Sequence, residues 1–421
     1  MADKIPSVQI LDKKNYFQQA LVSLPSALPY PPLSPSSLRL RTSVLSLTVN
    51  NFTYATLGNL LNWWDVHPLP PSTPEPYNDA SKYGRISAWG YAEVLESTVP
   101  SVPKGSHVWG YVPLGTLAQD LEVKPHPNPA ITDQIFVTSA YRAHVMPIYN
   151  RYFVYSDRAG DIARKTPEIA RDSILRVMHA TAFLMERFAF SSDDTRVVAP
   201  GMGPDDAWSA KDADLTDATV VIFAPGSKAA SIFASLLRKR TAEAGRPRRI
   251  IGAPSASSKA FVEGTGVYDS VVLTSADPVA AVGKDLGKRL IIFDFGGRAG
   301  IASQWAASLS TDHADTDFIL VTVGSGVVDP AAAPQLFAAM GKQPPYKTAR
   351  VNAGDMRRRA MQRVGEETYW SEEERSWEDF RKDGIKGLSA SWGEGMEDVI
   401  KGWDRLARGE VLPSEGLVFK L

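Results

Sequence analysis

The sequence contains no cysteine, which excludes disulfide bonds, cysteine nucleophiles and thiolate metal sites. Histidine is scarce, and no two histidines lie three to five residues apart, so the paired ligands of a helical zinc motif are missing. The histidines are His67, His107, His126, His144, His179 and His313. We therefore expect no metal centre, and only a site built from distant histidines and carboxylates stays open.

The sequence also lacks an excess of charge and any long apolar run. Its 46 basic and 47 acidic residues leave a formal net charge of -1, which indicates neither a nucleic acid nor an anionic membrane surface as partner. No uninterrupted apolar stretch is long enough to span a bilayer, and no apolar run follows the charged N-terminus as it would in a signal peptide. We expect a cytoplasmic globular protein, and 421 residues are enough for two or more lobes.

The pattern of apolar residues divides the chain into three parts. Residues 1–165 are expected to form a β-rich lobe, because alternating segments at 38–44, 92–97 and 106–112 are separated by turns rich in proline and glycine. Residues 166–345 are expected to form a Rossmann-like lobe, in which apolar runs alternate with helices as in a doubly wound parallel sheet. Residues 346–421 are highly charged and predicted helical, with a short β ending that returns to the first lobe.

The runs and helices of the second part carry most of the fold prediction. A helix is predicted over 169–190, and a second one after residue 227, with Ala230, Phe233, Ala234 and Leu237 on one face. Apolar runs at 219–223, 249–252, 270–273, 290–294 and 318–323 are expected to be the strands. Strands of this kind, buried on both faces, indicate a parallel sheet.

Four stretches outside these runs resemble a known family. The stretches are residues 47–55, 88–94, 109–113 and 141–152, of which Asn50-Asn51-x-Thr53-Tyr54-Ala55 and Tyr149-Asn150-x-Tyr152 are the most specific. The chain resembles the medium-chain dehydrogenase/reductase superfamily, with zinc-free quinone oxidoreductases as the nearest well-known branch. It is more similar still to a dehydrogenase-like family known as a domain of unknown function. The resemblance covers nearly the whole chain and implies a GroES-like β-rich lobe followed by a Rossmann-like α/β lobe.

The resemblance also implies possible activities. Some fungal members of the family belong to polyketide pathways, where the dehydrogenase fold works without a cofactor in releasing and cyclising the chain to an α-pyrone. That implies a polyketide substrate, free or bound to a carrier protein, and a polyketide synthase as partner. Many members of the superfamily are dimers, so a homodimer is left open.

The dinucleotide motif is altered. A nucleotide-binding turn needs Gly-x-Gly-x-x-Gly between the first strand and its helix, and residues 224–229 here read Ala-Pro-Gly-Ser-Lys-Ala. Gly226 keeps the middle glycine, whereas Ala224 replaces the first, and Pro225 removes a main-chain N–H donor. Ser227 and Lys228 are the pair that the resembled family retains at this place.

The end of the second strand distinguishes between cofactors. The acidic residue that would hold the ribose hydroxyls of NAD is missing, and a serine-rich loop ending in Lys259 stands there instead. Serine and lysine suit the 2′-phosphate of NADPH, so Gly226, Ser227, Lys228 and Lys259 are its candidate ligands. The other interpretation is that the loop is solvated and that no cofactor binds.

The candidate catalytic residues follow from the positions that border the active cleft in the superfamily. No zinc-ligand trio survives at these positions, so we do not expect a Lewis-acid role for zinc. Pyrone formation needs a base and donors that stabilise an oxyanion. His179 is the expected base, and a buried core histidine is the alternative. Asn50 and Asn51 are expected donors, unless they only shape the loop.

Three further side chains are candidates at this cleft. Tyr54 and Tyr149 are expected to donate protons, and packing in an apolar cleft is the alternative. Arg142 is expected to hold a phosphopantetheine phosphate or a carboxylate, unless it forms a structural ion pair.

Three functions therefore remain open. The first is a cofactor-independent enzyme that releases or cyclises a polyketide chain, and the resemblance and the altered motif favour it. The second is an NADPH-dependent, zinc-free reductase of a carbonyl or enone, favoured by the retained Gly226 and by Lys259. The third is a scaffold without catalysis.

Overall fold

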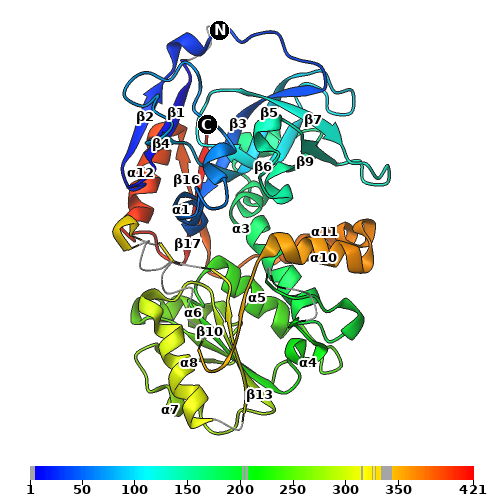
Figure 1. Cartoon of the computed structure of the whole chain (residues 1–421), viewed down its shortest axis with the longest axis vertical. Coiled ribbons are helices and arrows are strands. Elements are labelled where there is room, and N and C mark those ends of the chain that lie inside the picture. The colour runs from blue at the N-terminus through cyan, green and yellow to red at the C-terminus, as the bar shows by residue number, and fades with distance from the viewer. Residues whose placement is uncertain are drawn as a thin grey trace.

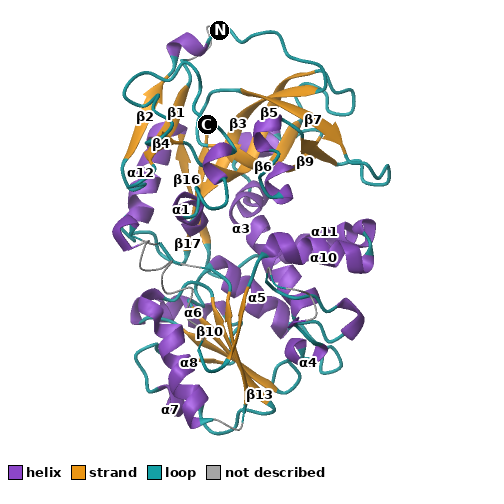
Figure 2. Cartoon of the chain, in the orientation of Figure 1, coloured by secondary structure: helices purple, strands orange, loops and turns teal. Residues whose placement is uncertain are grey.

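Two large β-sheets, stacked end to end with a helix between them, organise the computed structural model (Figure 1). The structure describes residues 5–201, 203, 207–313, 316–324, 326–327, 329–332 and 344–421. One sheet belongs to a β-rich lobe and the other to an α/β lobe, as Figure 2 shows by the distribution of strands and helices. The two-lobed α/β architecture predicted from the sequence is confirmed.

The β-rich lobe is an eight-stranded sheet that closes on itself. Its order is β16-β17-β3-β5-β6-β9-β8-β7, and β3 also pairs with β7, which makes the sheet a barrel. The strands are β3 (Ser37–Leu47), β5 (Ser87–Ser97), β6 (His107–Pro113), β7 (Gln119–Pro125), β8 (Gln134–Val137), β9 (Arg151–Tyr155), β16 (Ser389–Glu394) and β17 (Glu415–Lys420). The predicted segments 38–44, 92–97 and 106–112 lie in β3, β5 and β6.

A smaller sheet covers one end of this barrel. It consists of the antiparallel strands β2 (Gln19–Ser23), β1 (Ser7–Asp12) and β4 (Tyr83–Gly84). The helix α12 (Gly395–Ala407) packs against β1 and β2, where the amide of Gln19 bonds to the carbonyl of Ile400 at 2.8 Å. The N-terminal strands and the C-terminal helix therefore stabilise each other.

The α/β lobe is built on a six-stranded parallel sheet. Its order is β12-β11-β10-β13-β14-β15, and all neighbouring strands run parallel. The strands are β10 (Ala218–Phe223), β11 (Arg249–Ala253), β12 (Ser270–Val271), β13 (Arg289–Asp294), β14 (Asp317–Thr322) and β15 (Lys347–Arg350). All six residues of β10 are buried, as expected for the central strand of a sheet covered on both faces.

Helices cover both faces of this sheet. On one face, α5 (Lys228–Arg238) packs against Val220 and Ile222 through the side chains that the sequence predicted to be buried. On the other face, α8 (Ile301–Asp312) packs against Val221 and Phe223. Among the described residues, the lobe also contains the helices α4 (Ala210–Ala213), α6 (Lys259–Thr265) and α7 (Pro278–Val282).

The chain returns to the barrel later than expected. β15 still belongs to the parallel sheet, so the boundary expected at residue 345 falls before the last strand of that sheet. Two charged helices, α10 (Ala353–Val364) and α11 (Glu366–Asp383), follow it. β17 then pairs antiparallel with β3, a strand of the barrel.

The helix α3 (Pro167–Leu184) joins the two lobes. It follows the short α2 (Ala159–Arg164), continues into a π-helical turn at Met185–Ala189, and contacts β3, β5 and β17 on one side and α5, α10 and α11 on others. The carbonyl of Ser173 accepts a hydrogen bond from the Ser46 hydroxyl at 2.5 Å. α3 is thus buried nearly all round. Among the described helices, none is long and apolar enough to cross a membrane.

Candidate functional site at the junction of the lobes

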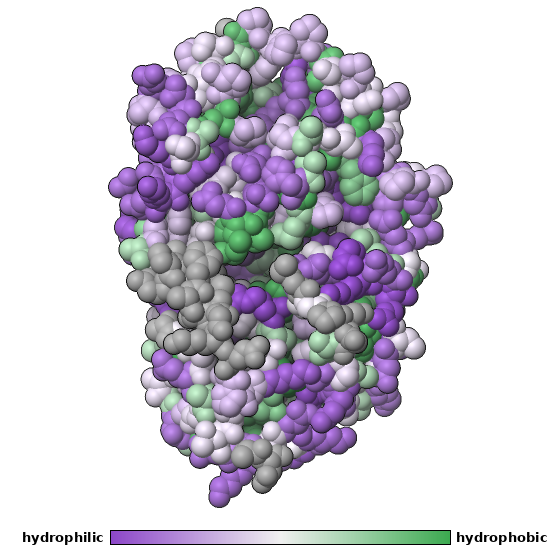
Figure 3. Space-filling model, viewed as in Figure 1, coloured by the Kyte–Doolittle hydropathy of each residue, from purple (hydrophilic) through white to green (hydrophobic). Residues whose placement is uncertain are grey.

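Apolar side chains gather beside a hollow between the two lobes. Figure 3 shows this group near α1 (Val49–Thr56) and the turn that follows it. Val49 and Leu60 are exposed, Leu60 by 67%, and Leu57 and Leu61 are half-buried. Large exposed apolar side chains beside a hollow are typical of a ligand-binding surface.

The two asparagines at the start of α1 have different environments. Asn51 is buried, where its side-chain oxygen accepts from the Thr48 N–H at 2.8 Å and its amide donates to the carbonyl of Ser87 at 3.0 Å. The first bond caps the helix and the second joins it to β5, so the loop-architecture interpretation fits Asn51. Asn50 is half-exposed and hydrogen-bonds with Tyr54 one helical turn later.

Tyr54 is the centre of a buried polar and aromatic cluster. Its hydroxyl accepts a hydrogen bond from the indole N–H of Trp89 at 2.9 Å and also bonds with Tyr149 and Asn50. The ring contacts Trp63 and Tyr149, with centroids 4.9 and 5.9 Å away. Burial raises the pKa of Tyr54 to about 12, so this phenol stays neutral near pH 7 and acts only as a hydrogen-bonding group. The structure therefore brings Asn50, Tyr54 and Tyr149 together.

Arg142 lies apart from any surface to which a phosphate could bind. Its guanidinium is fully buried and donates to the carbonyl of Tyr149 at 2.5 Å and to the hydroxyl of Tyr152 at 3.4 Å. These bonds hold the loop that carries Tyr149, and no ion pair with a carboxylate takes part in them. The placement favours a structural role, in which Arg142 contacts the Tyr54 cluster through the main chain of Tyr149.

His179 is not part of this group. The imidazole is fully buried between α3 and α11, where Nε2 bonds with the hydroxyl of Ser376 at 3.1 Å and the ring packs against Trp377 and Phe380. Burial lowers the pKa of His179 to about 3. A base must reach the proton that it removes, so this geometry supports the core-histidine interpretation that the sequence left open.

The altered nucleotide motif forms the turn between β10 and α5. Ala224 adopts the left-handed conformation with a φ of +50°, although it stands where a glycine is usual. Ser227 caps α5, because its hydroxyl accepts from the N–H of Ala230 at 3.3 Å. The tight turn has therefore survived the loss of the first glycine.

A segment from the other end of the chain covers this turn. A Cβ placed on Gly226 would lie 3.2 Å from the Cβ of Pro413, so Pro413 fills the space beside the middle glycine. The amine of Lys228 donates to the carbonyl of Glu415 at 2.7 Å. Burial lowers the pKa of Lys228 to about 8. Pro413 and Glu415 lie almost 200 residues after the motif in the chain, so sequence reasoning had no signal for this contact.

The neighbouring loop after β11 is exposed. The hydroxyl of Ser255 lies 3.1 Å from that of Ser257 and 3.2 Å from that of Ser258, and the amine of Lys259 lies 3.6 Å from Glu263. The loop thus presents hydroxyls and one ammonium to solvent at the carboxyl edge of the sheet, where ligands of open α/β sheets bind.

Asp294 is a feature of the same edge that sequence analysis did not single out. It ends β13, and its carboxylate accepts from the N–H groups of Gly296 and Gly297 at 2.9 and 2.6 Å. Burial raises the pKa of this carboxyl group. The sequence could have pointed to Asp294, because this acidic residue ends an apolar run and is followed closely by Gly296 and Gly297. Among the described residues, no group of three or more histidine or carboxylate side chains could hold a metal ion.

Comparisons with known proteins agree with this architecture. CurA from Vibrio vulnificus in complex with NADPH has 12% identity, a TM-score of 0.53 and 98% coverage of both chains. The 2-enoyl thioester reductase heterodimer Etr1p/Etr2p from Candida tropicalis has 11% identity, a TM-score of 0.54 and full coverage of both chains. At this identity the likeness shows the fold alone.

The sequence itself identifies a family. No curated protein sequence matches the chain. Residues 45–412, however, match the family described as "Protein of unknown function (DUF2855)". The chain therefore belongs to the DUF2855 family and has the medium-chain dehydrogenase fold.

Proposed function

We propose that this protein binds NADP(H) at the carboxyl edge of its parallel sheet and reduces a carbonyl or an enone. One observation carries the proposal: at the end of β11 the hydroxyls of Ser257 and Ser258 lie within 3.2 Å of that of Ser255, and the half-exposed Lys259 follows them directly in the chain. In dinucleotide folds this place selects between a ribose hydroxyl and a 2′-phosphate. The serine hydroxyls and the ammonium suit a phosphate, and the neighbouring carboxylate of Glu263 is paired with Lys259 at 3.6 Å.

The start of α5 provides a second part of the site. A helix N-terminus favours anions, and α5 begins directly after the turn in which a pyrophosphate would lie. Lys228, its first residue, would supply a positive charge once its amine left the carbonyl of Glu415. Ser227 and Lys228 would thus contact the pyrophosphate, and Lys259 the 2′-phosphate.

One contact opposes this fit. Pro413 lies beside Gly226, where the backbone of a dinucleotide turn approaches the pyrophosphate most closely. Residues 408–414, which connect α12 to β17, would have to move for the cofactor to reach the turn. NADPH binding is therefore expected to require a displacement of this connection.

The substrate would bind in the hollow beside α1. NADPH supplies a hydride when bound. Asn50 is a half-exposed residue of α1, so its amide would donate to the substrate carbonyl oxygen, on which negative charge develops during reduction. Tyr54 would position Asn50 through their hydrogen bond and would not ionise. The apolar side chains of Val49 and Leu60 would contact the remainder of the substrate.

Calorimetric titration of the full chain with NADPH and with NADH tests the proposal. We expect NADPH to bind at least tenfold more tightly than NADH, and Lys259→Gln to reduce this preference to threefold or less. The matched control is Lys288→Gln, an exposed lysine just before β13, at the opposite edge of the sheet. Equal binding of the two nucleotides, or no binding of NADPH at millimolar concentration, would contradict the proposal.

A second function is favoured by the contact between Pro413 and Gly226. If the turn stays covered, the fold would act without a cofactor, in the α-pyrone formation that the family resemblance implies. Asn50 would then stabilise the oxyanion formed on an attacked thioester carbonyl. Pyrone release from a polyketide thioester in the absence of nucleotide, together with no NADPH binding, would support this second function over the first.

A further inference from the structure

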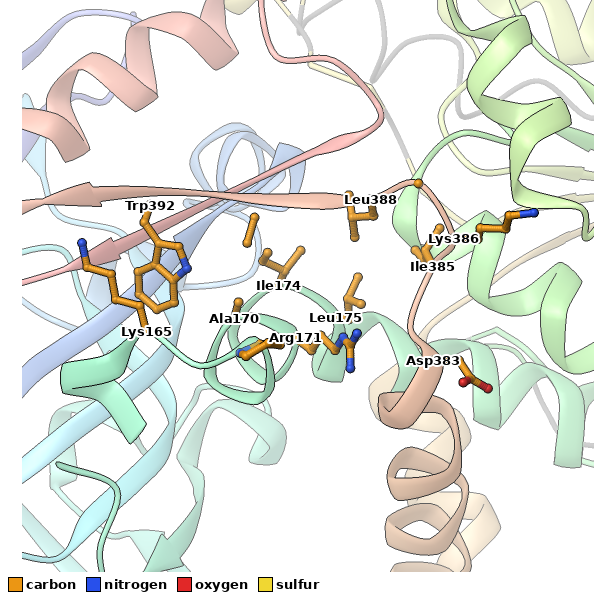
Figure 4. Close-up of a pocket in the computed structure, with 13 residues that line it drawn as sticks. Lys165, Ala170, Arg171, Ile174, Leu175, Asp383, Ile385, Lys386, Leu388 and Trp392 are labelled. Atoms are coloured by element: carbon orange, nitrogen blue, oxygen red, sulfur yellow. The ribbon is translucent and has the colours of Figure 1, made fainter. Parts of the chain in front are cut away.

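A pocket separate from the nucleotide turn lies between α3 and the segment that leads from α11 into β16. Its cavity volume is about 400 Å³, within the range of small-molecule sites. Figure 4 shows Lys165 and Trp392 at one end, and Asp383, Ile385 and Lys386 at the other. The pocket is therefore an elongated space with charged groups at its ends.

The middle of the pocket is apolar. Ile174 and Leu175 are buried residues of α3, and Leu388 is a half-buried residue directly before β16. Trp392 lies four residues after Leu388, and its half-buried indole ring also lines the pocket. Because β-strand side chains alternate, Leu388, Ala390 and Trp392 face the pocket, and Ser389 and Ser391 face away.

Positive charge exceeds negative charge around this apolar middle. Among the described residues that line the pocket, Lys165, Arg171 and Lys386 are cationic, and Asp383 is the acidic one. Lys165 is neutralised by Glu394, whose carboxylate lies 2.6 Å from its amine. Arg171 and Lys386 together therefore outweigh Asp383, which leaves one positive charge to be balanced.

Arg171 is already oriented for an anion. One of its terminal nitrogens donates to the carbonyls of Arg381 and Lys382 at 2.8 and 3.0 Å, at the end of α11. Within the described part of the chain it is thus held by carbonyl oxygens and not by a carboxylate. Gly384 makes room, since a Cβ there would lie 3.2 Å from Nε of Arg171. A fixed guanidinium with free N–H groups is a good partner for a carboxylate.

We infer that this pocket binds a small aromatic or aliphatic monocarboxylate, with its carboxylate on Arg171 and its apolar body against Ile174, Leu388 and Trp392. A small molecule is favoured over a protein segment because the lining forms a short pocket of limited volume. The inference does not depend on the proposed function, since the residues of the nucleotide turn do not line the pocket.

Calorimetric titration with 2-naphthoate and with its neutral isostere 2-naphthamide tests the inference. We expect 2-naphthoate to bind at least tenfold more tightly than the amide. Arg171→Gln should reduce this difference to threefold or less, because glutamine keeps a donor but loses the charge. Arg164→Gln is the matched control, since Arg164 is an exposed cation of α2 that does not line the pocket.

A second pair of variants tests the location without disturbing the core. Ala390 is exposed and lines the pocket, so Ala390→Trp should fill it and weaken 2-naphthoate binding at least tenfold. Ser389→Trp places the same bulk on the other face of β16 and should leave the affinity within twofold. Equal affinity for acid and amide, unchanged affinity in Arg171→Gln and Ala390→Trp, or no binding of 2-naphthoate at millimolar concentration would each overturn the inference.

Discussion

The amine of Lys228 donates a hydrogen bond to the main-chain carbonyl of Glu415 and thereby joins the first turn of α5 to the first residue of β17. The two residues belong to different lobes. The carboxylate of Glu415 is itself paired with Arg405 at 2.8 Å, so the carbonyl has a fixed position. A single buried ammonium thus links the nucleotide turn with the last strand of the barrel.

This link should appear as a pH dependence of stability. The pKa of Lys228 falls from 10.5 to about 8 on folding, because burial disfavours the ammonium. Between these values the unfolded chain binds more protons than the native state, so stability increases with pH. We expect the free energy of unfolding of the wild type, relative to Lys228→Met, to rise by at most about 3 kcal/mol from pH 8 to 10.5. Urea denaturation at several pH values between 8 and 10.5 measures this free energy for both proteins.

The control for this prediction is an exposed lysine. Lys288→Met should leave the pH dependence of unfolding as it is in the wild type. A difference between wild type and Lys228→Met that stays constant across the range would show that the Lys228 amine is not buried in solution.

The left-handed conformation of Ala224 predicts a stabilising substitution. An L-residue in this conformation costs about 1–2 kcal/mol, which glycine avoids, and glycine loses part of that gain through its larger chain entropy. Ala224→Gly should therefore increase the free energy of unfolding by about 1 kcal/mol. Ala229→Gly, one residue inside α5, should instead lower it by about 0.5–1 kcal/mol. The same sign for both variants in chemical denaturation would contradict this account of the turn.

His179 should influence stability at acidic pH and leave catalysis unaffected. Its pKa falls from 6.5 to about 3 on folding, so below pH 6.5 the unfolded chain takes up a proton that the native state does not. Relative to His179→Gln, the wild type should lose about 1.4 kcal/mol of stability for each pH unit between pH 6.5 and about 3. Activity per folded molecule should be the same for both proteins. A loss of activity in the variant at unchanged stability would instead restore His179 as a catalytic base.

Arg142 should be essential for the loop that carries Tyr149. Arg142→Met removes the donors to the Tyr149 carbonyl and the Tyr152 hydroxyl in a buried place, which should cost about 2–4 kcal/mol. Arg41→Met is the control, because Arg41 is exposed and pairs with Glu93, and should cost less than about 0.5 kcal/mol. Thermal denaturation of both variants decides the matter, and a similar melting temperature for the two would refute the structural role.

The sequence was sufficient for the fold because its signals there are local. The apolar run of β10 and the spacing of Phe233 and Leu237 in α5 report burial directly. Local signals also located the nucleotide turn and the serine-rich loop before Lys259. The family stretches located Asn50, Tyr54 and Tyr149, and the structure brings these three into contact.

The contacts made by partners far away in the chain could not be predicted. Buried polar and apolar residues alternate around α3, so its sequence pattern does not predict that His179 faces α11 instead of the hollow. The sequence around Arg142 does not distinguish it from a surface arginine. Only the folded loop shows that its guanidinium donates to a carbonyl and a hydroxyl group. The contact of Pro413 with Gly226 depends on the return of β17, which no local pattern places next to β10.

The pairing of β17 with β3 has a consequence for synthesis of the protein. β3 (Ser37–Leu47) leaves the ribosome long before β17, but Val44, Leu45 and Leu47 find their partners only at Lys420, Phe419 and Leu417. Until then, the main-chain groups on this edge of β3 are unpaired beside strongly apolar side chains, which is the arrangement that favours strand addition and aggregation. The barrel is thus completed only after the α/β lobe between its strands has been made, and until then this edge of β3 can pair with a strand of another chain.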